Sequence, residues 1–220
     1  MKLALPEHID SAIFDLDGTL IISSHIWGDI DRKFLAKRGF EVPGDYVADI
    51  ACMNFREGAD YTIKRFGLNE DPDDIIAEWF GMAQYEYAHN IRMKNGAEEF
   101  LRVLKNAGFR IALATASNPA LYLPVLENNG VLDCFDALVS TEEVCRSKRF
   151  PDVYLLAAGR LGASVRDCAV FEDQAQCVES AKTGGFFVCG CLDDHEISDH
   201  DRIRSSADIV FREYSELFCR

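Results

Sequence analysis

Short apolar runs and amphipathic stretches alternate along the second half of the chain. Five apolar runs of four to six residues, bounded by turn-forming residues, are typical of strands buried on both faces of a sheet. They cover residues 12–16, 110–115, 137–140, 168–171 and 186–189, and a sixth candidate covers 207–211. The segments between them carry apolar residues at helical spacing, as in "NGAEEFLRVLKNAG". From about residue 93 onward, this alternation predicts an α/β fold: a parallel sheet with helices on both faces.

Residues 23–90 show a different pattern. Three stretches have helical spacing and no convincing strand accompanies them: "DIDRKFLAKRGF", "REGADYTIKRFG" and "PDDIIAEWFGMAQYEYAHNI". We therefore predict an α/β core domain of residues 1–22 and 91–220, with a helical domain of residues 23–90 inserted after the first strand. The segment "LDDHEISDHDR", which contains His195 and His200, is predicted to be a solvated loop.

Charge and composition exclude some classes of partner. The chain has 37 acidic and 23 basic side chains, a formal charge of −14, whereas nucleic-acid backbones require basic surfaces. No apolar run approaches the 18 residues of a membrane span, and the start "MKLALPEHID" turns polar too early for a secretory signal. We expect a cytoplasmic protein without nucleic-acid or membrane partners, with reduced cysteines, as a monomer or weak dimer.

The stretch "FDLDGTL" places two carboxylates, Asp15 and Asp17, at the end of the first predicted strand. A buried charge is costly unless it is paired or binds a metal. In a strand that continues through both, their side chains would point to the same side. Thr115 follows the second strand, Lys148 lies in the turn after the third, and Glu172 and Asp173 end the fourth. Because ligands bind beyond the carboxyl ends of parallel strands, we expect these side chains to cluster there.

Phosphoryl transfer is the chemistry that this set of residues supports. Magnesium prefers oxygen ligands, which the carboxylates of Asp15 and Asp173 and the backbone carbonyl of Asp17 can supply. An aspartate can attack phosphorus, but each pair of like charges about 4 Å apart costs on the order of 4 kcal/mol at a dielectric near 20. Mg²⁺ and Lys148 would offset that repulsion. The Thr115 hydroxyl and the amides after Asp15 can bind phosphate oxygens. Ser117, two residues after Thr115, suits either this site or a helix cap.

Four stretches occur in the order "FDLDGTL", "IALATAS", "SKRFPD" and "VFEDQAQCVESAKTGG". Together they resemble the motifs of the haloacid dehalogenase superfamily of aspartyl-phosphate phosphotransferases, and the resemblance covers the whole chain. "ACMNFREGADYTIKRFG" also resembles the caps of the β-phosphoglucomutase-like branch. The resemblance implies a Rossmann-like, doubly wound parallel sheet of order 5-4-1-2-3 with a helical cap.

The resemblance also implies roles for individual residues. Asp15 corresponds to the nucleophile and Asp17 to the acid/base that protonates the leaving oxygen and then activates water. Glu172 corresponds to a carboxylate that supports the metal site. The implied phosphate-binding residues are Thr115, Ala116, Lys148 and Gly18, and the implied Mg²⁺ ligands are Asp15, Asp17 and Asp173.

The chain departs from the family pattern at four positions. Ile22 replaces an acidic residue, Arg149 replaces the proline after the lysine, and Gln174 and Cys177 replace a serine and a glycine of the fourth motif. None of these changes removes a catalytic atom. We expect the Cys177 side chain to crowd the loop beside the metal and to affect the rate more than the type of reaction.

Several reactions occur in this superfamily. Mutases of this branch carry a histidine where this chain has Trp27, although Arg56 matches an arginine that contacts the distal phosphate in the mutase. Dehalogenases usually lack the second aspartate, and nothing singles out a lysine for phosphonate hydrolysis. The sequence thus favours a Mg²⁺-dependent phosphatase for a small phosphorylated metabolite, with Arg56 and Trp27 as candidate substrate contacts. A β-phosphoglucomutase-like mutase and a catalytically weak binding protein are the alternatives.

Overall fold

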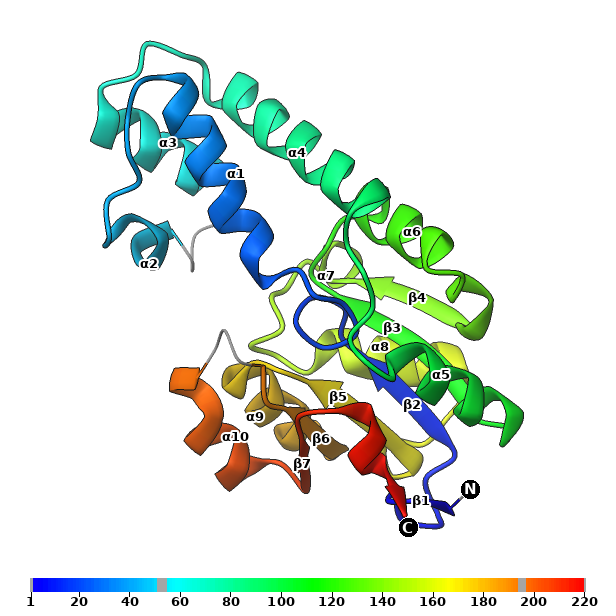
Figure 1. The fold of residues 1–220 in the computed structure, drawn as a ribbon. Helices are drawn as coiled ribbons and strands as arrows, with labels where there is room; N and C mark the ends of the chain where they lie inside the picture. Colours follow the sequence, from blue (N-terminus) through cyan, green and yellow to red (C-terminus); the bar gives the residue numbers. More distant parts are fainter. Residues whose placement is uncertain (1, 51–54, 194–196, 220) are drawn as a thin grey trace. The chain divides into compact units, whose positions relative to one another are not determined.

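The computed structural model describes residues 2–50, 55–193 and 197–219 (Figure 1). The chain forms two compact units. One comprises Met1–Ser23 and Ile91–Arg220, and the other comprises Ser24–Asn90.

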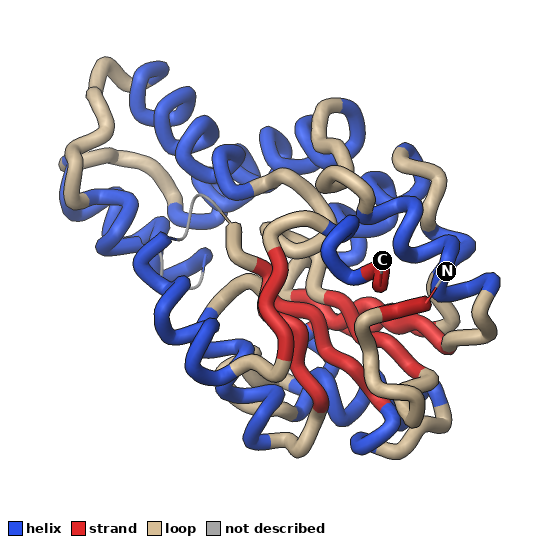
Figure 2. The backbone as a smooth tube through the Cα atoms, turned by 60° about the horizontal axis from the view of Figure 1, so that its bottom comes forward, coloured by secondary structure: helices blue, strands red, loops and turns tan. Residues whose placement is uncertain are grey.

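The larger unit is built on one parallel sheet of six strands, seen side by side in Figure 2. The strands are β2 (Ser11–Phe14), β3 (Arg110–Thr115), β4 (Ala137–Ser140), β5 (Cys168–Glu172), β6 (Phe187–Cys191) and β7 (Ile209–Phe211). Their order is β4-β3-β2-β5-β6-β7, and every neighbouring pair is parallel. The order predicted for five strands is confirmed, and the sixth candidate forms an additional edge strand beside β6.

Helices cover both faces of this sheet. They are α5 (Ala97–Asn106), α6 (Pro119–Asn128), α7 (Thr141–Val144), α8 (Asp152–Leu161), α9 (Ala175–Thr183) and α10 (His200–Ser206). Ile13 belongs to a buried cluster with residues of α8 and α9. The next residue, Phe14, packs against Phe100 of α5 and stacks on Phe171, with ring centroids 6.3 and 4.3 Å apart. Because neighbouring residues of a strand point to opposite faces, α5 lies across the sheet from α8 and α9, as Figure 1 shows.

Short elements complete this unit. Two-residue strands at the chain ends, β1 (Lys2–Leu3) and β8 (Phe218–Cys219), pair antiparallel and bring the termini together (Figure 1). Four single-turn 3₁₀ helices are η1 (Leu132–Cys134), η2 (Val165–Asp167), η3 (Ile197–Asp199) and η4 (Tyr214–Leu217). Over the described residues, no helix of either unit is long and apolar enough to cross a membrane.

The described residues of the smaller unit form the helices α1 (Ser24–Lys37), α2 (Tyr46–Ile50), α3 (Phe55–Phe66) and α4 (Pro72–His89). Asp71 caps α4 by accepting a hydrogen bond of 2.8 Å from the Asp73 amide, and Pro72 occupies the first turn. Phe34 packs against Trp79 in the core, with ring centroids 5.3 Å apart. Helix α2 was not predicted because its five residues are too few to show a period.

Several predicted strand bounds are wrong by one or two residues, and one predicted loop is wrong. The first strand ends at Phe14 instead of residue 16. The predicted solvated loop contains η3 and α10, and His200 is buried with its Nε2 atom 2.7 Å from the Asp193 carbonyl oxygen. This hydrogen bond satisfies a ring nitrogen that the prediction assigned to water. His195 and residues 51–54, the start of the stretch that resembles the caps, lie outside the described residues.

Candidate active site

The loop after β2 carries the first motif. The Asp15 amide donates to the Phe171 carbonyl at 3.0 Å, so pairing with β5 continues one residue beyond the strand. The chain then turns at Gly18, whose φ of 79° lies in the left-handed region. Hydrogen bonds of 2.8 and 3.0 Å from the Leu20 and Ile21 amides to the Leu16 carbonyl close the turn. Asp17 therefore belongs to a turn, and strand alternation does not govern its direction.

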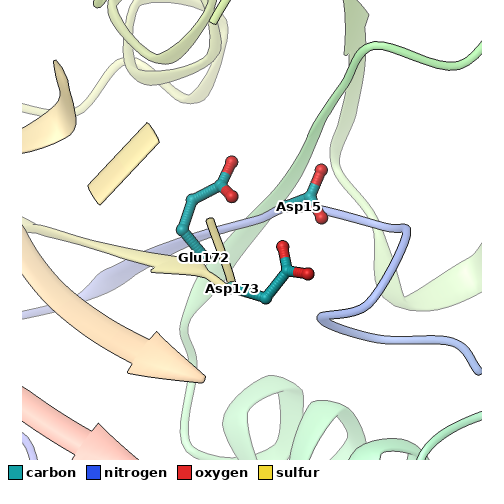
Figure 3. Close-up of side chains that lie close together, drawn as sticks. All are labelled: Asp15, Glu172 and Asp173. Atoms are coloured by element: carbon teal, nitrogen blue, oxygen red, sulfur yellow. The ribbon is translucent and has the colours of Figure 1, made fainter. Parts of the chain in front are cut away.

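Three carboxylates converge at the ends of two neighbouring strands. Asp15 follows β2, Glu172 ends β5, and Asp173 comes next (Figure 3). All three are buried, and each offers an oxygen atom within 4.8 Å of the other two. The parallel pairing of Phe14 with Phe171 brings the two strand ends level. The structure thus joins three of the predicted site residues into one acidic cluster.

Lys148 supplies a positive charge to this cluster. It lies in the loop before α8 and is only 8 % exposed. Its Nζ atom contacts Asp15 Oδ1 and lies 2.5 Å from Glu172 Oε1. Burial opposes the charged form of Lys148, but the two carboxylates outweigh burial and hold its pKa above the ordinary value. Lys148 therefore stays an ammonium group beside the predicted nucleophile.

Burial also changes the acidity of the carboxylates. It raises the pKa of Asp15 to about 7, with Lys148 lowering that pKa and Glu172 and Asp17 raising it. Burial, together with Asp15 and Glu172, raises the pKa of Asp173 well above its ordinary value. Burial and mutual repulsion therefore oppose the ionised forms of Asp15 and Asp173, and a further positive charge at the cluster would favour those forms.

Asp17 points to a different partner. Its Oδ2 atom accepts a hydrogen bond of 2.6 Å from the Ser117 hydroxyl. The Ser117 amide in turn donates to Thr115 Oγ1 at 2.9 Å, so the loop after β3 holds both Thr115 and Asp17. Ala116, between Thr115 and Ser117 in the chain, is exposed. Ser117 is not the helix cap, because Asn118 caps α6 by accepting a 2.9 Å bond from the Ala120 amide.

Gly18 and Thr19 lie against Asp173. A Cβ atom at position 18 would overlap the Asp173 carboxylate, so the loop fits only with glycine there. The Thr19 hydroxyl lies 3.4 Å from Asp173 Oδ1 and is the single side-chain donor to that carboxylate among the described residues. The Cys191 thiol lies 3.8 Å from the Gly18 carbonyl oxygen and 3.7 Å from Lys94 Nζ, which also pairs with Asp193 at 2.5 Å.

The residues present fit a divalent cation. Among the described side chains, Lys148 alone forms ion pairs with any of the three buried carboxylates, and Asp173 receives only one long hydrogen bond. A buried carboxylate with so few donors needs a counter-charge. Carboxylate oxygens at this spacing are the donors that Mg²⁺ prefers.

The sequence does not assign two of the site residues: it gives no signal for Tyr154 and leaves Ser117 open between the site and a helix cap. Tyr154 of α8 donates a hydrogen bond of 2.6 Å to Glu172 Oε1. Burial and the Glu172 charge raise its pKa well above the ordinary value, so it remains a hydroxyl donor. Tyr154 occupies the apolar face of a helix and looks like core in the sequence, and Ser117 looks like a cap. In both cases the partner lies more than ten residues away in the chain, where no spacing rule applies.

The candidate substrate residues lie in the helical unit. Arg56 of α3 forms an exposed ion pair with Asp73 of α4. The Trp27 ring contacts the Phe55 ring edge to face, with centroids 5.5 Å apart. Each of these contacts stays inside that unit, so the structure gives both residues a structural partner and leaves their substrate role a proposal.

The four departures from the motifs differ in burial. Ile22, Arg149 and Gln174 are exposed, whereas Cys177 in the first turn of α9 is buried. The Cys177 thiol lies 3.9 Å from Gln174 Oε1. Burial raises the pKa of this thiol well above its ordinary value, so it is protonated and unreactive.

Comparison with known proteins identifies the class. Residues 9–185 match the family model described as "haloacid dehalogenase-like hydrolase". The chain is 31 % identical over 84 % of its length to the bifunctional riboflavin kinase/FMN phosphatase of Arabidopsis thaliana, but the match spans only 49 % of that protein. It is 28 % identical to hexitol phosphatase B of Escherichia coli K12, with 82 % of each chain covered. β-Phosphoglucomutase of Bacillus subtilis is 31 % identical, with 94 % of this chain and 91 % of that protein covered.

Solved structures show the same fold. β-Phosphoglucomutase from Clostridium difficile has a TM-score of 0.74 and 20 % identity, with 96 % of this chain and 93 % of that chain covered. The fold and the family match define a hydrolase built on a Rossmann-like sheet. The chain belongs to the haloacid dehalogenase-like hydrolases, which confirms the family predicted from the four motifs.

Proposed function

We propose that this protein is a Mg²⁺-dependent phosphatase that hydrolyses the phosphate monoester of a small metabolite through an aspartyl-phosphate on Asp15. One observation carries the proposal: the Asp15 carboxylate lies at a strand end, in contact with the Lys148 ammonium and within 4.8 Å of Glu172 and Asp173. An aspartate in that setting is suited to attack a phosphate whose negative charge the neighbouring cations offset.

In this proposal Asp15 attacks phosphorus and the alcohol oxygen leaves. Lys148 binds the phosphoryl oxygens, together with the Thr115 hydroxyl and the backbone of Gly18 and Ala116. Asp15, Asp173 and the Asp17 carbonyl would hold a divalent cation, which when bound offsets the charge of the nucleophile and the phosphate.

Asp17 is the proposed acid and base. It gives a proton to the leaving oxygen and later removes one from the water that attacks the phosphorus of the aspartyl-phosphate. The 2.6 Å hydrogen bond from Ser117 supports this role because it holds the Asp17 carboxylate in a defined orientation. Water then displaces Asp15, and phosphate is released.

A mutase is the second candidate, because β-phosphoglucomutase of Bacillus subtilis has the same 31 % identity to this chain as the plant FMN phosphatase. Against it stands Trp27, which takes the position of the mutase histidine and packs on Phe55. An indole ring does not exchange protons as an imidazole does. We infer that phosphate passes to water and not to a second sugar hydroxyl.

We also propose that the helical unit is a cap that selects the substrate, with Arg56 and Trp27 among its contacts. The relatives support a small phosphorylated metabolite as substrate, since their names include an FMN and a hexitol phosphatase. We place the enzyme in the cytoplasm, as a monomer or weak dimer acting on this one small partner.

Phosphate release from a panel of monoesters tests the proposal. The panel contains hexitol phosphates, sugar phosphates, FMN and p-nitrophenyl phosphate, each with Mg²⁺ and with EDTA. We expect release that requires Mg²⁺ and is lost in Asp15→Asn. β-Glucose 1-phosphate with a bisphosphate primer is the mutase arm: conversion to the 6-phosphate without free phosphate would favour the mutase. A folded, Mg²⁺-binding protein that does neither would be a binding protein.

A further inference from the structure

The Tyr154 hydroxyl is a buried polar group, bonded to Glu172 beside the reacting residues, that the proposed reaction does not use. Tyr154 is fully buried, and its ring packs edge to face on Phe186 with centroids 6.2 Å apart. Its position in the first turn of α8, six residues after Lys148, turns the side chain back toward the Lys148 loop. A residue clamped in the core in this way is a rigid support for its neighbours.

Tyr154 and Lys148 share one oxygen atom. Glu172 Oε1 accepts a hydrogen bond of 2.6 Å from the Tyr154 hydroxyl and one of 2.5 Å from Lys148 Nζ. These are the only side chains among the described residues that donate to Glu172. The Lys148 Nζ atom also lies over the Tyr154 ring, 5.7 Å from its centroid. Tyr154 therefore interacts with the Lys148 ammonium in two ways: indirectly through Glu172, and directly through the face of its own ring.

This arrangement matters because the partner of Lys148 changes during the proposed reaction. At rest the ammonium contacts Asp15 Oδ1 and Glu172 Oε1. Once Asp15 carries the phosphoryl group, that contact gives way to phosphoryl oxygens, and Glu172 is the anchor that remains. If the Glu172 carboxylate were not held in place, the Lys148 ammonium would move with it. The hydrogen bond from the Tyr154 hydroxyl holds the Glu172 carboxylate in place.

We propose that Tyr154 is a positioning residue that, through its hydrogen bond to Glu172, holds the Lys148 ammonium in place for phosphoryl transfer. The role in turnover rests on the proposed phosphatase function, whereas the role in holding Lys148 does not. Tyr154→Phe is the sharpest variant, because it removes the hydroxyl and keeps the ring on Phe186 and under Lys148. Tyr122→Phe is the matched control, since Tyr122 of α6 is a buried tyrosine in the same unit and belongs to none of the contacts described for the site.

The first test measures Lys148 itself and needs no turnover. Trace labelling with acetic anhydride, followed by mass spectrometry of each peptide, reports how accessible every lysine amine is. We expect Tyr154→Phe to raise labelling of Lys148 about 3-fold or more, a shift that fits the loss of one hydrogen bond to a charged group. Lys94 is the internal control: its side chain is 14 % exposed in the same unit and paired with Asp193, so its labelling should stay unchanged. A general loosening of the fold would raise both.

The second test is kinetic. Tyr154→Phe should lower kcat about 10-fold, the size expected for one hydrogen bond to a carboxylate, and change KM less than about twofold. In a Glu172→Gln background the same substitution should cause little further loss, because the hydroxyl acts through Glu172. Tyr122→Phe should change neither quantity.

The outcomes separate this inference from the proposed function. Unchanged Lys148 labelling together with wild-type kcat in Tyr154→Phe would overturn the positioning role. Full additivity with Glu172→Gln would overturn the route through Glu172. A wild-type protein that releases no phosphate, but in which Tyr154→Phe exposes Lys148, would end the phosphatase proposal and leave the positioning of Lys148 standing.

Discussion

Gly18 and Asp173 lie so close together that a side chain at position 18 would overlap the Asp173 carboxylate. The two residues come from the ends of neighbouring strands, and Gly18 turns the chain with a φ of 79°. The loop that presents Asp15 and Asp17 is therefore matched to the carboxylate proposed as the third metal ligand.

Gly18→Ala tests this match. We expect phosphate release to fall about 100-fold or more and Mg²⁺ affinity to drop, because Asp173 must move and a left-handed φ costs a non-glycine residue about 1–2 kcal/mol. Calorimetric Mg²⁺ titration and phosphate release measure both effects. Gly159→Ala in α8 is the control: a Cβ atom at that position would meet nothing within 4 Å among the described residues, so activity should persist. Equal Mg²⁺ affinity in Gly18→Ala and wild type would contradict the proposed ligand.

Ser117→Ala tests whether the Ser117 hydroxyl prepares Asp17 for acid catalysis. Loss of one hydrogen bond should slow turnover about 3- to 10-fold, and the loss should be larger for alkyl phosphates than for p-nitrophenyl phosphate. The reason is that a poor leaving group needs the proton most. Ser205→Ala is the control, because that hydroxyl donates to the Arg202 carbonyl on the exposed side of α10. The idea fails if the two substrate classes lose activity equally.

A pH-dependent stability is expected from the helical unit. Asp31 of α1 is buried, and burial raises its pKa from 3.8 to about 6. The folded state thus favours the protonated form, so the stability that this group contributes is present below about pH 4 and is lost as the pH rises through about 6. The full difference is about 3 kcal/mol, since one pKa unit corresponds to about 1.4 kcal/mol.

Asp31→Asn removes this titration. We expect the variant to melt above the wild type at pH 8, and the difference in Tm to shrink at pH 5, as measured by scanning calorimetry. Asp29→Asn on the same helix is the control, because Asp29 forms a surface ion pair with Arg32. A difference in Tm that is the same at both pH values would show that Asp31 does not titrate in this range.

Much of the fold follows from local patterns. Apolar runs of four to six residues predicted the strands, and the family resemblance implied their order in the sheet. What failed depended on contacts distant in sequence or on elements too short to show a pattern. The buried His200 donates a hydrogen bond from its ring to the Asp193 carbonyl oxygen, a contact that no local pattern predicts. Helix α2 is too short to show a period.

The site residues also fall into those that local patterns predict and those that depend on contacts distant in sequence. Asp15, Lys148, Glu172 and Asp173 were predicted to cluster because each follows the end of a strand, and these four come together. Asp17 instead turns toward Ser117, because β2 ends at Phe14 and alternation stops there. Tyr154 has no sequence signal at all, since its hydroxyl matters only through Glu172, 18 residues further along the chain.

The most direct measurement is to trap the phosphorylated residue. Borohydride reduces an aspartyl-phosphate to homoserine, so the enzyme is mixed with Mg²⁺ and a good substrate from the panel, quenched with borohydride and digested for mass spectrometry. We predict homoserine at residue 15, dependent on substrate and absent in Asp15→Asn. Rapid phosphate release with unmodified Asp15, or with homoserine at another aspartate, would contradict the account.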